Sequence, residues 1–129
     1  MTDRTIDSHG TARAHLHLDG LALLALAIVT YSVAGGSWWL FLALLLAPDL
    51  FMLGYLAGPR IGSIVYNAGH GLVWPVVLVS AGLLGATAPA ESVVLHVGII
   101  WAAHIGIDRA CGFGYKYPTR LNDTDIGRA

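Results

Sequence analysis

The sequence contains few charged residues. Only 12% of its 129 residues are Asp, Glu, Lys or Arg, against about 25% in ordinary soluble domains. The formal net charge is −1 and no block rich in Lys and Arg occurs, which argues against a nucleic-acid partner. Cys111 is the only cysteine, which excludes an intrachain disulfide and a zinc site built on several cysteines.

The beginning of the sequence also lacks the features of a cleaved signal peptide. Asp3, Asp7 and Asp19 accompany Arg4 and Arg13, whereas a signal peptide starts with a short, positively charged region. No convincing Ala-x-Ala-like cleavage site follows the apolar run. We therefore expect the residues from Leu21 onward to be a retained membrane span.

Hydrophobic residues are abundant, at 56%, and gather in four runs. Each run approaches the roughly 20 residues that a helix needs to cross a bilayer, and none shows the polar stripe of a soluble helix. We predict an all-α fold, a four-helix up-down transmembrane bundle, because short connections make neighbouring helices antiparallel. The expected parts are a polar segment at 1–17, a transmembrane domain at 18–111 with spans at about 18–34, 38–57, 61–84 and 91–110, and a polar tail at 112–129.

The basic residues predict the orientation of the chain. All seven flank the spans on one side: Arg4, Arg13, Arg60, Arg109, Lys116, Arg120 and Arg128. The positive-inside rule makes that side cytoplasmic, so we expect both termini in the cytoplasm and the chain in the cell's inner (plasma) membrane. The expected partner is the lipid bilayer; a homo-oligomer or a larger membrane complex stays open.

Among the ionisable residues within the predicted spans, four form the candidate site: Asp49, His70, His104 and Asp108. Such groups are costly in a membrane, usually face the bundle interior and are commonly functional. At about 1.5 Å per residue, Asp49, His70 and His104 fall at similar depths in the cytoplasmic half, with Asp108 nearer the surface. The pattern predicts one polar cluster, to which three helices contribute residues.

Two histidines and two carboxylates suit a divalent transition metal such as zinc, iron or manganese. His104 and Asp108 are four residues apart, so they lie on one side of a helix. Around these four expected metal ligands we place Tyr66, Asn67 and Arg109. Separate roles stay open for each residue: packing across helices for Asn67 and His70, a helix end for Asp108, and an N-cap for Asp49.

Several short motifs hold glycine, aromatic and polar residues in a specific order. They are Gly35-Gly36-Ser37-Trp38-Trp39, Ala47-Pro48-Asp49-Leu50, Met52-Leu53-Gly54-Tyr55, Ala57-Gly58-Pro59-Arg60-Ile61-Gly62, Tyr66-Asn67 with His70, Ala103-His104-Ile105-Gly106-Ile107-Asp108-Arg109 and Gly112-Phe113-Gly114-Tyr115-Lys116-Tyr117. From about Leu18 onward these motifs resemble DUF4260, a family of small bacterial membrane proteins of unknown function. The resemblance supports the membrane fold and implies no reaction. It departs from the family at Asp125, where the family's tail usually has histidine.

Two functions remain open from the sequence. In the first, the cluster is a metal site that performs chemistry on a small or lipid-soluble substrate, either hydrolytic or oxidative. In the second, the protein is not an enzyme, and the same groups relay protons or ions or fix the helices within a larger assembly. The chain lacks Gly-x-Ser-x-Gly and His-Glu-x-x-His motifs, so catalytic residues are not assigned from sequence.

Overall fold

The computed structural model describes residues 3–85, 87–88 and 91–128, and this part of the chain is helical without any strand. Its only bridge of β type joins Lys116 and Thr124 within the described residues. The helices are α1 (Asp3–Val33), α2 (Trp38–Leu44), the 3-10 helix η1 (Ala47–Ala57), α3 (Pro59–Gly69), α4 (Val73–Gly85), α5 (Val93–Ala110) and α6 (Asp125–Arg128).

Four segments in the described residues are long and apolar enough to cross a membrane: Gly10–Val33, Trp38–Ala57, Pro59–Gly85 and Val93–Ala110. Many large apolar side chains on them point outward; Trp39, Leu56 and Leu84 are each more than 80% exposed. Such surfaces suit lipid rather than water. The predicted all-helical membrane fold is thus confirmed, and α1 continues through the polar N-terminal segment as one helix.

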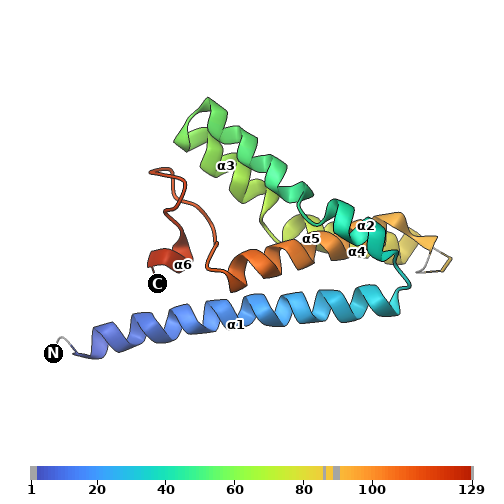
Figure 1. The fold of residues 1–129 in the computed structure, drawn as a ribbon, viewed down its shortest axis with the longest axis horizontal. Helices are drawn as coiled ribbons and strands as arrows, with labels where there is room; N and C mark the ends of the chain where they lie inside the picture. Colours follow the sequence, from blue (N-terminus) through green and yellow to red (C-terminus); the bar gives the residue numbers. More distant parts are fainter. Residues whose placement is uncertain (1–2, 86, 89–90, 129) are drawn as a thin grey trace.

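The long helix α1 lies beside α5 over much of its length (Figure 1). Glycine makes this approach possible, because a Cβ atom on Gly106 would lie 2.7 Å from the backbone nitrogen of Leu24. At the end of α5, the ring of His17 hydrogen-bonds to the carbonyl of Ala110 at 2.8 Å, which satisfies a carbonyl that a helix terminus leaves free. Small residues at such crossings are typical of membrane helices.

The second and third spans are interrupted. In the second, α2 ends at Leu44 and η1 begins at Ala47, beside Pro48, which supplies no backbone N–H donor. The apolar run 61–84 predicts one continuous helix, whereas the structure divides it between Gly69 and Val73. Glycines on both sides of His70 have low helix propensity, and the indole of Trp101 on α5 donates a hydrogen bond to the Gly69 carbonyl at 2.7 Å.

The two interruptions change the shape of the bundle. The pair η1 and α3 leans away from α1, whereas α4 continues beside α5 (Figure 1). Successive spans still run up and down, so that both ends of the chain lie on the same side of the molecule. We call this the tail side, because residues 112–128 lie there.

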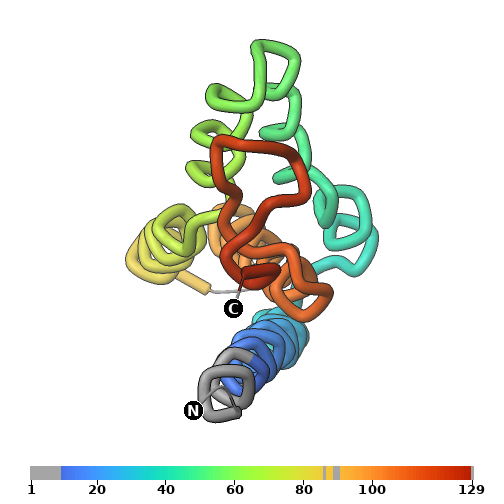
Figure 2. Tube along the Cα trace, turned by 90° about the vertical axis from the view of Figure 1, so that its left-hand side faces the viewer, coloured from blue at the N-terminus to red at the C-terminus, as the bar shows by residue number. Residues whose placement is uncertain are grey.

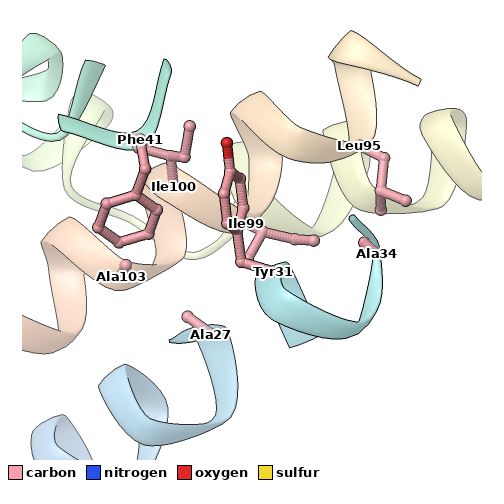
Figure 3. Close-up of a cluster of buried hydrophobic side chains, with 8 residues drawn as sticks. All are labelled: Ala27, Tyr31, Ala34, Phe41, Leu95, Ile99, Ile100 and Ala103. Atoms are coloured by element: carbon pink, nitrogen blue, oxygen red, sulfur yellow. The ribbon is translucent and has the colours of Figure 1, made fainter. Parts of the chain in front are cut away.

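The apolar core lies between α1, α2 and α5, toward the other side (Figure 3). Tyr31 is fully buried at its centre, with its ring 5.0 Å from that of Phe41 and 5.3 Å from that of His96. Its hydroxyl donates to the Ser37 carbonyl at 2.7 Å, and His96 contacts the Ala34 carbonyl at 3.2 Å. These contacts tie the end of α1 to the beginning of α5 and satisfy the polar groups of Tyr31 and His96 inside the core.

The cytoplasmic position of the tail side remains a prediction, based on the basic residues. Reporter fusions after Gly85 and at the C-terminal end should report opposite sides of the membrane, because α5 crosses between them. A fusion at the C-terminal end that reports the outer side would contradict the orientation.

Candidate metal centre

The interruptions in the spans position two of the four predicted ligands, Asp49 and His70. Asp49 lies in the first turn of η1, directly after Pro48. His70 follows the last residue of α3 as its C-cap. His104 and Asp108 lie one turn apart on α5, and both face the break. Non-helical backbone at membrane depth occurs where it is buried in protein or lines a cavity.

These four side chains meet at one point. The Nε2 atoms of His70 and His104 are 3.1 Å apart, and the Asp108 Oδ2 atom lies 3.4 Å and 3.5 Å from them respectively. The Asp49 Oδ1 atom is 3.4 Å from His104 Nε2 and 3.8 Å from His70 Nε2. All four atoms lie within 4.8 Å of one another. The predicted residues are therefore brought together.

The spacing fits a single metal ion. Ligands about 2.0–2.1 Å from a tetrahedral zinc ion lie about 3.3 Å from one another, and the five separations above scatter around that value. The donor atoms, imidazole nitrogen and carboxylate oxygen, are those that zinc, iron and manganese take in proteins.

Tyr66 orients two of the four residues. Its backbone carbonyl accepts a hydrogen bond from His70 Nδ1 at 2.9 Å, so the lone pair of a neutral His70 ring lies on Nε2 and faces the cluster. The two rings also stack, with centroids 3.7 Å apart. The Tyr66 hydroxyl donates to Asp108 Oδ2 at 3.1 Å. Such outer contacts fix the tautomer and direction of metal ligands.

The cluster is open on one side. The side chains of His70 and His104 are 5% and 3% exposed and that of Asp108 is 17% exposed, whereas that of Asp49 is 42% exposed. A pocket of about 240 Å³ adjoins Asp49 and Asp108 and is also lined by Met52, Tyr66, Phe113, Lys116, Leu121 and Asn122. Asp49 is thus where a molecule entering this pocket meets the cluster.

The C-terminal tail forms part of the pocket wall, where it crosses the end of α3 (Figure 2). Asn67 holds its backbone by two hydrogen bonds: the Asn67 amide nitrogen donates to the Lys116 carbonyl at 2.8 Å, and the Lys116 N–H donates to Asn67 Oδ1 at 2.7 Å. Buried Ile126 in α6 and Thr124 keep the tail folded back. Burial lowers the pKa of the Lys116 amine, and this effect outweighs the negative charges of Asp108 and Asp49, which raise it.

Other predicted residues have different surroundings. Asn67 holds the tail, and the guanidinium of Arg109 lies 5.8 Å above the ring of Tyr115. Asp125, at the departure from the family pattern, begins α6 and does not belong to the group of four. Sequence reasoning missed Lys116 as a neighbour of the site, although its place as the sole lysine, between two tyrosines, is a visible signal.

Comparison with known families places this geometry in context. Residues 13–129 match the family model described as "Domain of unknown function (DUF4260)". The chain belongs to the DUF4260 family. No curated protein and no solved structure matches it. All four residues of the cluster lie within the part of the chain that the DUF4260 model covers, so the family resemblance inferred from the motifs is confirmed.

Proposed function

We propose that this protein holds one divalent transition metal, most simply zinc, between His70, His104, Asp108 and Asp49, and uses it to transform a small substrate on the tail side of the membrane. The observation that carries the proposal is the convergence of four ligand-type atoms within 4.8 Å. Four ionisable groups at such a depth would be expensive without a partner that offsets their charge and satisfies their lone pairs.

The four residues divide into a firm set and an accessible one. His70, His104 and Asp108 have the shortest mutual distances and are the least exposed. Two histidines and one carboxylate are the protein ligands of several catalytic zinc sites and of non-haem iron sites, which keep a further position for water or substrate. Asp49 faces that position from the pocket side, where it can exchange a proton with a molecule in the pocket.

A bound metal would supply Lewis acidity and lower the pKa of a coordinated water. The chain itself supplies the rest. Tyr66 orients the side chains of His70 and Asp108 through its hydrogen bonds. The apolar helices exclude water from the other sides of the cluster, and the tail forms part of the pocket wall.

The second candidate is a proton or ion carrier, or an accessory subunit, without catalysis. The 3.1 Å contact between the Nε2 atoms of His70 and His104 favours it, because two imidazoles at that distance can share one proton. The carboxylates of Asp49 and Asp108 would then act as proton acceptors on either side.

Metal content separates the two functions. Protein extracted from membranes in mild detergent should contain about one zinc, iron or manganese ion per chain, and removing it with a chelator should lower the melting temperature, since the metal stabilises only the folded state. Less than about a tenth of an ion per chain, with no melting shift when zinc, iron or manganese is added, would leave the proton-relay function instead.

A further inference from the structure

The pocket beside the cluster has one cation in its wall. Lys116 is the only lysine of the sequence, and it is 6% exposed to solvent. Its ammonium group donates to the Leu121 carbonyl at 2.8 Å and lies 4.5 Å above the ring of Tyr66. Lysine is seldom buried to this extent unless it has a charged partner.

No carboxylate in the described residues lies within ion-pair distance of this ammonium group. A cation above an aromatic ring gains part of its lost solvation, and the Leu121 carbonyl uses one of its three N–H donors. The other two N–H donors of the ammonium group remain for a ligand. Lys116 lines the same pocket as Asp49 and Asp108.

The charges of the pocket depend on the metal. A divalent ion held by the two histidines and Asp108, with Asp49 beside it, would be neutralised by the two carboxylates, since the histidines bind it as neutral rings. The ammonium of Lys116 would then be the uncompensated charge. In surroundings of low dielectric constant such a charge favours a ligand of opposite sign.

We propose that the pocket binds a small organic carboxylate, held between the Lys116 ammonium and the metal centre, and that this is the substrate class of the site. This inference rests on the proposed metal site. A carboxylate carries the single negative charge that balances Lys116, whereas a phosphate monoester carries close to two at neutral pH.

The dimensions and lining agree with this class. At about 240 Å³, the pocket is smaller than the roughly 300–1,000 Å³ of sites for drug-sized ligands. Met52, Phe113 and Leu121 provide apolar surface beside the charged groups. A short carbon chain can therefore lie against these residues while its carboxylate faces Lys116.

The test uses the full protein in nanodiscs, loaded with cobalt(II) so that ligand binding changes its visible spectrum. Acetate and octanoate are titrated separately. Both carry a carboxylate group, so the comparison distinguishes a small free carboxylate from a fatty acid derived from lipid. In Lys116→Met, affinity for both should fall by about tenfold or more, as expected when one partner of a buried charge pair is removed. Lys116→Arg should retain most of the affinity because it keeps the charge.

The variant is suited to the test because Asn67 holds the backbone of Lys116 and not its side chain. Arg120→Met, which removes an exposed positive charge from the same tail, is the matched control and should bind like the wild type. Metal content is measured for every variant. As an independent readout, acetate should slow reductive methylation of Lys116, the only lysine side chain available.

The outcomes separate this inference from the metal site. Equal carboxylate affinity in the wild type and Lys116→Met, with cobalt bound to both, overturns the carboxylate site alone. Protection of Lys116 from methylation by acetate that survives removal of the metal overturns it as well, because the charge argument requires the ion. A wild type that takes up no metal overturns both proposals.

Discussion

Replacing His104 by alanine should reduce the metal content of the purified protein by at least about tenfold, because loss even of an outer residue that orients a metal ligand costs about 10–100-fold in affinity. His70→Ala should act similarly, since the two Nε2 atoms form the shortest contact in the cluster. Both variants would leave Asp49 and Asp108 close together without a cation. We therefore expect a lower melting temperature along with the lost metal.

His96→Ala is the matched control for these two variants. His96 is buried on the same helix as His104, but it contacts Tyr31 and the Ala34 carbonyl in the apolar core. The His96→Ala protein should be somewhat less stable than the wild type and should still bind the metal. The measurement is metal per folded chain by elemental analysis after size-exclusion chromatography. Full metal occupancy in His104→Ala would refute the assigned ligand set.

Gly20→Leu should separate α1 from α5 and greatly reduce the yield of folded protein. A Cβ atom on Gly20 would lie 2.4 Å from the backbone nitrogen of Ala110, a contact that only movement of one helix can relieve. Overpacking of well-packed sites costs about 1–3 kcal/mol, and here the obstacle is backbone rather than a flexible side chain. The readout is the melting temperature of the detergent-solubilised protein, followed by fluorescence during size-exclusion chromatography.

Gly10→Leu provides the comparison within the same helix. A Cβ atom at Gly10 meets no atom within 4 Å, so the substitution should leave the melting temperature close to that of the wild type. A similar loss in both variants would indicate that leucine disturbs α1 itself rather than its contact with α5.

The sequence predicts the spans and the cluster because both depend on strong local signals. Long apolar runs define membrane helices, and isolated ionisable residues within them have few stable locations other than a shared interior. Asp49, His70, His104 and Asp108 are recognisable on this basis, and the structure brings them together. Pro48 lies at the break in the second span, where the structure changes from α2 to η1, and its missing backbone N–H is a local signal of that break.

Other features depend on contacts between distant residues and have no local signal. Asn67 appears from its spacing to belong with His70, yet its side chain holds the backbone of Lys116, 49 residues further along the chain. The division of the third span at His70 depends in part on Trp101 from another helix. The role of Lys116 in the pocket wall follows only when the tail folds back across the end of α3.

The position of the tail has a consequence for biogenesis. Residues 112–128 follow all four spans in the chain, so they leave the ribosome after the helices have begun to enter the membrane. Asn67 and the remaining pocket wall are therefore inserted while their partner at Lys116 is still being synthesised. Until the tail has been synthesised, the pocket lacks the part of its wall that Phe113, Lys116, Leu121 and Asn122 form. Folding of the tail then completes the pocket wall, so the pocket forms only after all four spans have been synthesised.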